Sequence, residues 1–236
     1  MSVTEPPGSA CGHCRAAIRA RDNIPILSWV ILRGKCRDCG TAIHWRYPVV
    51  EAATAALFAG VATVHGLVWI LPVLLVVAWS AVVATAIDLE FRIIPNRMTY
   101  PLAPLVLVLV LVAAALDNAW DRALWALGAG LAIPLAMFLL SESFRLLRGK
   151  PGIGMGDIKW APALAMTLGY LSPLHLVVWF YATIFSAGFV AIALIIARRV
   201  KFATRIPYGP YLALGWVLAV LAGGPLTDGL RNYLGI

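Results

Sequence analysis

The chain has 236 residues, of which 61% are hydrophobic and 13% are charged, and its formal net charge is +8 at pH 7. Soluble domains carry roughly 45–50% apolar and about 25% charged residues, so the composition excludes a water-soluble globule, and the scarcity of charge excludes a disordered chain. The Lys and Arg residues lie in short clusters between long apolar runs, which indicates membrane topology and no nucleic-acid partner. We expect an all-α polytopic membrane protein.

The first 47 residues form a polar, basic segment that holds all four cysteines. These occur as two Cys-x-x-Cys pairs, Cys11 with Cys14 and Cys36 with Cys39. Two such hairpins place four thiolates at the corners of a tetrahedron, as in a closed structural zinc site. Two disulfides are the alternative, but disulfides need an oxidising compartment. We expect residues 1–47 to form a cytoplasmic zinc module whose folding depends on the metal.

About seven apolar runs follow, most of them near the roughly 20 residues that cross a bilayer. The fifth run is short and has to lean on its neighbours or on a thinned bilayer. We expect membrane helices at 48–66, 67–87, 101–116, 122–140, 158–172, 174–197 and 207–224, which together make 48–236 the transmembrane domain.

The distribution of positive charge predicts the orientation of these spans. With the N-terminus inside, all Lys and Arg residues except Arg122 and Arg231 fall on the cytoplasmic side, where such residues concentrate. Seven spans then put the C-terminus outside. The cysteines would lie in the reducing cytoplasm, which favours zinc over disulfides.

Two aspartates lie where an apolar span meets the cytoplasmic side. Asp88 ends the second span, and Asp157 opens the fifth after Gly154 and Gly156. Paired carboxylates can divide the work of peptide hydrolysis, because one takes a proton from water while the other donates a hydrogen bond to the scissile carbonyl. The two glycines would let a substrate backbone approach closely. Helix dipoles predict that Asp157, at a helix N-terminus, is the base and that Asp88, at a C-terminus, holds the proton.

At these residues the chain resembles the prepilin peptidases, the type IV leader peptidases, which are GxGD-type membrane aspartyl proteases of the bacterial inner membrane. The resemblance rests on motifs that follow one another in order: the paired cysteines, 22–29, 32–36, 46–51, Asp88 with 94–96, 154–159 and 205–210. It implies that Asp88 and Asp157 are catalytic. It also implies that the substrates are type IV prepilins or pseudopilins, cut after a Gly at the cytoplasmic membrane face.

The resemblance implies a second activity as well. Many members with four cysteines also methylate the new N-terminus with S-adenosylmethionine as the donor. The residues themselves supply no site for that donor, since no glycine-rich nucleotide fingerprint is present. Members of this type usually carry a further span before the cysteine module, where this sequence has only Met1 to Ala10. This departure bears most on the methyltransferase activity.

Two other classes of function fit parts of the sequence. Acidic residues inside a membrane are typical of proton- or cation-coupled transporters, and four cysteines alone would suit a non-catalytic, zinc-dependent secretion or pilus assembly protein. A transporter would place its acids near the bilayer midplane and often shows repeat symmetry. Both aspartates lie at one edge of the predicted bundle instead, so we favour the peptidase.

Overall fold

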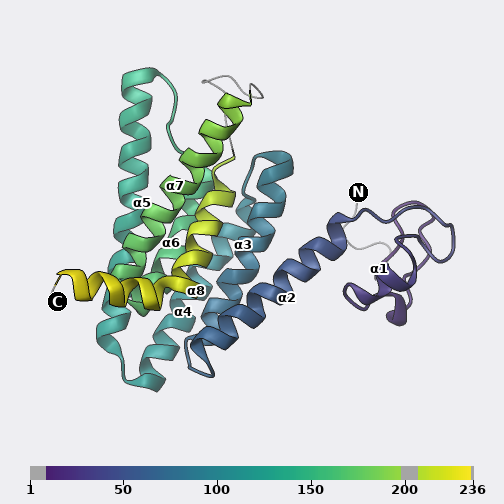
Figure 1. The fold of residues 1–236 in the computed structure, drawn as a ribbon, viewed down its shortest axis with the longest axis horizontal. Helices are drawn as coiled ribbons and strands as arrows, with labels where there is room; N and C mark the ends of the chain where they lie inside the picture. Colours follow the sequence, from purple (N-terminus) through teal and green to yellow (C-terminus); the bar gives the residue numbers. More distant parts are fainter. Residues whose placement is uncertain (1–8, 198–206, 235–236) are drawn as a thin grey trace. The chain divides into compact units, whose positions relative to one another are not determined.

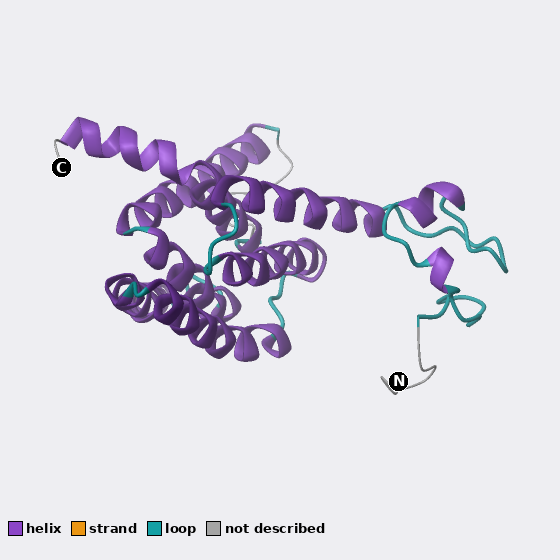
Figure 2. Ribbon diagram, turned by 90° about the horizontal axis from the view of Figure 1, so that it is seen from below, coloured by secondary structure: helices purple, strands orange, loops and turns teal. Residues whose placement is uncertain are grey.

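A computed structural model describes residues 9–197 and 207–234 of the chain. Within these ranges the regular structure is helical, with two isolated β-bridges and no strand (Figure 2). The expectation of an all-α protein is therefore confirmed. The chain divides into two compact units, Met1–Leu57 and Phe58–Ile236, which are described separately below.

The N-terminal unit contains little regular structure. A 3-10 helix covers Ala20–Asp22 and the short helix α1 covers Leu27–Ile31. Trp29 of α1 donates a hydrogen bond of 3.1 Å from its indole Nε1 to the carbonyl of Ile43. Gly34 lies under this ring with φ of 68°, and a Cβ atom there would lie 2.9 Å from Trp29 Cζ2. Glycine therefore meets both a backbone requirement and a space requirement at this position.

Seven long helices follow within the described residues (Figure 1). Six of them are long and apolar enough to cross a membrane, and the remaining one, α6, has 17 residues and corresponds to the short fifth run of the sequence. The helices are α2 (Arg46–His65), α3 (Leu71–Phe91), α4 (Asn96–Asp117), α5 (Trp120–Arg148), α6 (Met155–Leu171), α7 (Pro173–Ile196) and α8 (Gly209–Leu234).

Helix α6 is the centre of the C-terminal unit. It contacts α3, α4, α5, α7 and α8 (Figure 1), and most of its side chains are buried, including Trp160, Leu164 and Leu168. A helix that is surrounded by five others needs little length, because its ends meet protein instead of lipid headgroups. The short fifth run is thus an interior helix, and it carries Asp157 at its first turn.

Small residues and buried hydrogen bonds hold α6 against its neighbours. A Cβ atom on Gly169 would lie 2.8 Å from the carbonyl oxygen of Trp125 in α5, so only glycine permits this close approach. The indole of Trp160 donates 3.1 Å to Ser80 Oγ of α3. The indole of Trp216 in α8 donates 2.9 Å to Thr167 Oγ1. These contacts fix α3 and α8 relative to α6.

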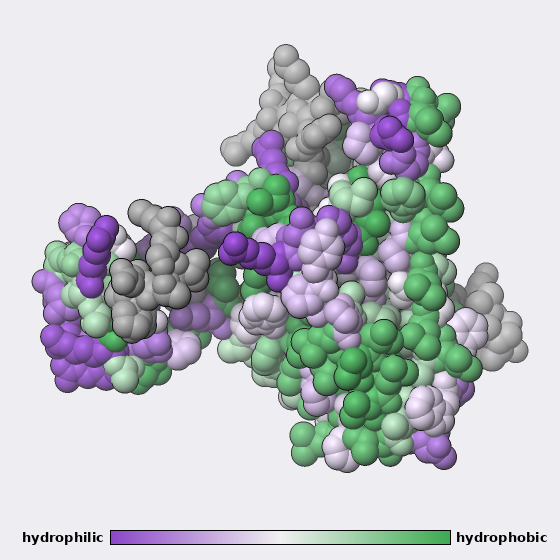
Figure 3. Space-filling view, turned by 180° about the vertical axis from the view of Figure 1, so that it is seen from behind, coloured by the Kyte–Doolittle hydropathy of each residue, from purple (hydrophilic) through white to green (hydrophobic). Residues whose placement is uncertain are grey.

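The outer helices present apolar side chains outward, as a lipid environment requires. Leu131 of α5 is 73% exposed, and Phe185 and Phe189 of α7 are 70% and 76% exposed. Figure 3 shows hydrophobic residues over much of one face of the bundle, whereas the surface of the N-terminal unit is mostly hydrophilic. The C-terminal unit is therefore a multi-pass membrane protein.

Candidate functional site

Asp88 lies in the last turn of α3 and is 5% exposed. The backbone amide of Gly209, the first residue of α8, donates a hydrogen bond of 3.0 Å to Asp88 Oδ2. A Cβ atom on Gly209 would lie only 2.9 Å from that oxygen. A side chain at position 209 would therefore displace the carboxylate, and glycine is what allows the N-terminus of α8 to reach Asp88.

Asp157 lies in the first turn of α6 and is 8% exposed. Its Oδ1 atom is buried and has no hydrogen-bond partner among the described residues. The preceding Gly154 is the N-cap residue and provides no side-chain cap. A Cβ atom on Gly154 would lie 2.8 Å from Asp157 Oδ2, so glycine leaves room for the carboxyl group.

The helix ends that carry the two carboxyl groups meet, although the helices are far apart in the chain. Ile94, in the loop between α3 and α4, packs between the helix ends that carry them. A Cβ atom on Gly156 of α6 would lie 3.1 Å from Ile94 Cβ, and one on Gly209 of α8 would lie 3.3 Å from Ile94 Cδ1. The C-terminus of α3 and the N-termini of α6 and α8 therefore converge on this buried isoleucine and on the aspartate pair.

Lys159 ties the first turn of α6 to the first turns of α4. Its Nζ donates hydrogen bonds of 3.0 Å to Asn96 Oδ1 and 3.0 Å to the Tyr100 hydroxyl, and it lies 4.9 Å from the centroid of the Tyr100 ring. Because Lys159 is two positions from Asp157, these bonds restrain the turn that carries the carboxyl group.

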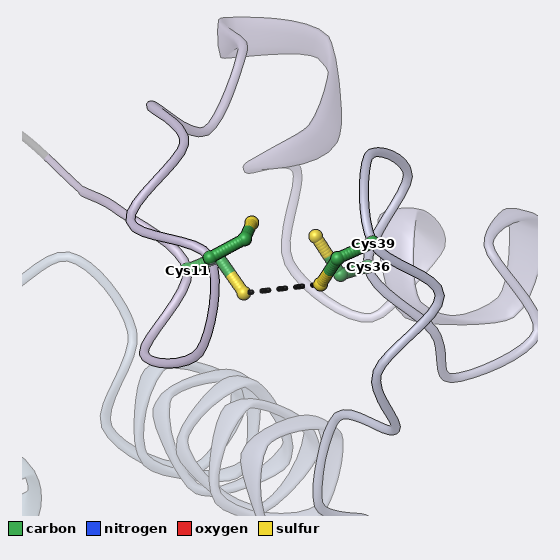
Figure 4. Close-up of side chains that lie close together, drawn as sticks. Cys11, Cys36 and Cys39 are labelled. Atoms are coloured by element: carbon green, nitrogen blue, oxygen red, sulfur yellow. Dashed lines mark hydrogen bonds between the residues drawn. The ribbon is translucent and has the colours of Figure 1, made fainter.

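The N-terminal unit brings all four cysteines together, as the spacing predicts. Their Sγ atoms lie within 4.8 Å of one another and none is in a disulfide. The Sγ atoms of Cys11 and Cys39 are 3.8 Å apart, and those of both hairpins face a common point (Figure 4). Four thiolates at about 2.3 Å from a tetrahedral zinc ion would be about 3.8 Å apart. The cluster could hold a metal ion, and its donor set and size fit zinc.

The two cysteine hairpins have matching backbones. The residue after each second cysteine, Arg15 or Gly40, has positive φ, 60° and 71° respectively. Its amide donates to the carbonyl of the first cysteine of the pair, at 2.9 Å in both hairpins. An isolated β-bridge then closes each hairpin, Ala10 with Ala17 in the first and Lys35 with Ala42 in the second. The two hairpins thus use the same turn, and each presents a pair of thiols.

Two ion pairs join the second hairpin to the segment between the hairpins. Arg37 donates 2.6 Å and 2.8 Å to the two carboxylate oxygens of Asp22, and Arg19 donates 3.2 Å to Asp38. The hydrogen bonds from the Arg37 guanidinium hold the pKa of Asp22 below its usual range. The intervening residues of the second Cys-x-x-Cys motif therefore hold the unit together around the thiol cluster.

A pocket of about 700 Å³ lies within the N-terminal unit and is lined in part by Trp29, His44 and Tyr47. At its edge Glu51 accepts a hydrogen bond of 2.7 Å from the amide of Ile26. Ile26 has φ of 61°, a conformation unusual for a β-branched residue. The contact gives Glu51 a role in fixing the loop before α1.

Sequence reasoning identified the two aspartates and the four cysteines but missed Gly209 and Ile94 as parts of the aspartate site. Both positions lie in motifs that carried the family resemblance, 205–210 and 94–96, which was the available signal. Gly156 packs closely against Ile94, so packing also explains the glycine at this position. A close approach of substrate to Gly154 and Gly156 stays a prediction.

Comparison with known proteins gives matches along most of the chain. The model of the bacterial peptidase A24 N-terminal domain matches residues 1–65, and that of the type IV leader peptidase family matches residues 74–196. A prepilin leader peptidase/N-methyltransferase of Aeromonas hydrophila is 37% identical over 229 residues, which cover 97% of this chain and 76% of the relative. The proteins of the same name from Stutzerimonas stutzeri and Pseudomonas aeruginosa are each 34% identical, over 96% and 97% of this chain and 76% and 75% of theirs. No solved structure matches.

Proposed function

Because this chain belongs to the type IV leader peptidase family, we propose that it is a membrane aspartic endopeptidase that removes the leader peptide from type IV prepilins or pseudopilins. The cut falls after a Gly at the cytoplasmic face of the inner membrane. Asp88 and Asp157 are the catalytic pair. The relatives' names support the substrate class, and the placement of the two carboxyl groups supports the residues.

One observation carries the assignment of the catalytic pair. Asp88 and Asp157 are both buried at helix ends that meet at Ile94, although most acids in a membrane protein lie in solvated loops. Burying two like charges side by side is costly, and such an arrangement is typical of a site where one proton is shared between two carboxyl groups. That state is the one an aspartic protease needs.

The orientation predicted from Lys and Arg fits this substrate. A prepilin crosses the membrane as an apolar helix with its basic leader in the cytoplasm. The acids are therefore needed where that helix emerges, and an N-terminus inside with the C-terminus outside puts Asp88 and Asp157 on that side. Lipids are the other partners, through the exposed apolar faces of the outer helices.

We further propose that the cysteine cluster, Cys11, Cys14, Cys36 and Cys39, binds one structural Zn²⁺. The four thiolates would complete a closed tetrahedron with no open position for substrate or water. The metal would then supply folding free energy to a unit that has few buried apolar residues. Its contribution is to hold the two hairpins together.

The names of the relatives also support N-methylation of the newly formed N-terminus. That reaction would take its methyl group from S-adenosylmethionine. The pocket of the N-terminal unit has a volume within the range of small-molecule sites, about 300–1,000 Å³, and we assign no single residue to the donor. Mass spectrometry of the cleaved product, with and without S-adenosylmethionine, tests this second activity as a mass gain of one methyl group.

The peptidase is tested with the purified full chain in detergent and a candidate prepilin as substrate. The wild type is expected to release a leader-sized fragment, and Asp88→Asn and Asp157→Asn to release none. Asp117→Asn is the matched control, because Asp117 at the end of α4 contacts Tyr170 and not the aspartate pair. Unchanged cleavage by either Asp88→Asn or Asp157→Asn would refute the assignment.

A further inference from the structure

Asp88 is as buried as Asp157, but unlike Asp157 it has a contact that stabilises its ionised form. The Gly209 amide donates to Oδ2, and this amide belongs to the first residue of α8. An amide at a helix N-terminus carries the positive end of the helix dipole. A hydrogen bond from a backbone amide stabilises a carboxylate more than a neutral carboxyl group. The unfavourable position of Asp88 near the C-terminus of its own helix is thereby offset by a second helix.

The surroundings of Asp157 favour its protonated form. Its Oδ1 atom is buried without a donor among the described residues, and its side chain is almost wholly removed from solvent. A buried carboxylate oxygen without a donor loses its hydration and gains no hydrogen bond in return. This desolvation cost exceeds the stabilisation that a helix N-terminus gives to a carboxylate. A proton on Asp157 removes the cost and also the repulsion with Asp88.

We propose that the aspartate pair carries its single proton on Asp157, and that the Gly209 amide keeps Asp88 ionised as the base. This assignment is the reverse of the one that helix dipoles alone predict from the sequence. It deepens the proposed peptidase function and rests on it for its role in hydrolysis. Gly209 is a positioning residue, because it acts through Asp88.

Tyr208 and Lys159 are two further titratable side chains beside the aspartate pair. Tyr208, just before α8, is the further titratable side chain that interacts with Asp157, and a phenol remains neutral near pH 7. Lys159 of α6 is held by Asn96 and Tyr100 of α4.

The assignment orders the proton transfers of hydrolysis. Asp88 takes a proton from water while the water oxygen bonds to the scissile carbonyl carbon, and Asp157 gives its proton to the carbonyl oxygen. In the second step the C–N bond breaks as the proton on Asp88 passes to the leaving amine nitrogen. Asp157 regains a proton from a hydroxyl of the tetrahedral intermediate as the carbonyl re-forms. The pair ends in its starting state, and one water has been added across the amide.

Infrared spectroscopy of the full chain in detergent at pH 7 tests the proton's location without relying on activity. A protonated carboxylic acid and a carboxylate absorb at different frequencies, and the Asp88→Asn/Asp157→Asn double variant gives the background from all other acids. In Asp88→Asn the protonated band of Asp157 is expected to remain, because its oxygen still lacks a donor. In Asp157→Asn the band is expected to be absent, because Asp88 keeps the Gly209 amide.

A lost band in Asp88→Asn, or a protonated band in Asp157→Asn, would overturn the assignment. These outcomes are separate from those of the cleavage assay. If the spectra agree with the assignment but the wild type cleaves no prepilin, the peptidase proposal fails and the location of the proton stands. If the wild type cleaves prepilin and the spectra disagree, only the assignment of the proton fails.

Discussion

The amide of Gly209 at the start of α8 donates a hydrogen bond of 3.0 Å to Oδ2 of Asp88 at the end of α3. Two helices that are remote in sequence are thus joined at a carboxylate that we propose to be catalytic. The contact requires glycine, since a Cβ atom would lie 2.9 Å from the oxygen and 3.3 Å from Ile94 Cδ1. It therefore links the packing of the α3–α4 loop to the chemistry of the site.

Gly209→Ala is expected to lower kcat for prepilin cleavage by about 10- to 100-fold, the effect of losing a hydrogen bond to a charged group. KM should stay nearly constant, because this amide is bonded to Asp88 and its loss acts on that carboxylate. Gly128→Ala is the matched control, since a Cβ atom there meets nothing within 4 Å. Steady-state kinetics on the three proteins measures the effect, and equal kcat values for Gly209→Ala and Gly128→Ala would contradict it.

Removal of zinc is expected to unfold the N-terminal unit and to leave the helices of the C-terminal unit intact. Apparent binding free energies of structural zinc are about 10–16 kcal/mol. The apolar core of a unit of this size cannot replace that contribution to the free energy of folding. Limited proteolysis after chelation, with metal content measured in parallel, should show cleavage confined to 1–57. Cys36→Ser should reproduce this result without chelator, and protease resistance in that variant would argue against a structural metal.

Arg15→Gly is expected to strengthen zinc binding by about fivefold. Arg15 has φ of 60° where the matching position of the second hairpin is Gly40, and a non-glycine residue in this region costs about 1 kcal/mol. Gly40→Ala should weaken binding by a similar factor, although a Cβ atom there meets nothing within 4 Å. Competition with a chromogenic chelator measures both. An equal effect of the two substitutions in the same direction would refute the backbone argument.

Lys159→Met is expected to destabilise the C-terminal unit by about 1–2 kcal/mol, because two hydrogen bonds from a charged donor are lost. The first turn of α6 would also become less restrained, so kcat should fall. Lys150→Met removes an exposed lysine in the loop before α6 and serves as the control. Thermal unfolding in detergent compares the three proteins, and a variant as stable as the wild type would show that the contacts with Asn96 and Tyr100 carry no net energy.

The sequence predicted the number and order of the long helices well, because apolar runs must become helices in lipid. It placed their ends less well. The run at 122–140 becomes α5, Trp120–Arg148, since polar residues such as Glu142 and Arg145 continue the helix and form an ion pair on it. Similarly, α4 begins at Asn96 and includes Pro101 and Pro104. The apolar run begins only at residue 101, so it could not indicate the first turn of this helix.

The sequence predicts the residues of the proposed site, whereas the contacts around them become visible only in the structure. Carboxylates and cysteines stand out in an apolar sequence, so Asp88, Asp157 and the cysteines could be identified directly. The division of roles that we propose for the two acids depends on a donor from Gly209, which is remote in sequence from Asp88. Local helix dipoles could not reveal that donor, so they predict Asp157 as the base, whereas we propose Asp88.

The shortness of α6 has a consequence for where hydrolysis takes place. Its 17 residues extend about 25 Å, less than the roughly 30 Å of a typical hydrocarbon layer. With α6 centred in the bilayer, its first turn lies below the level of the surrounding headgroups, and water has to enter there to reach Asp157. Acyl-chain length should then regulate turnover, with short-chain lipids bringing the solvent closer to the acids and long-chain lipids withdrawing it.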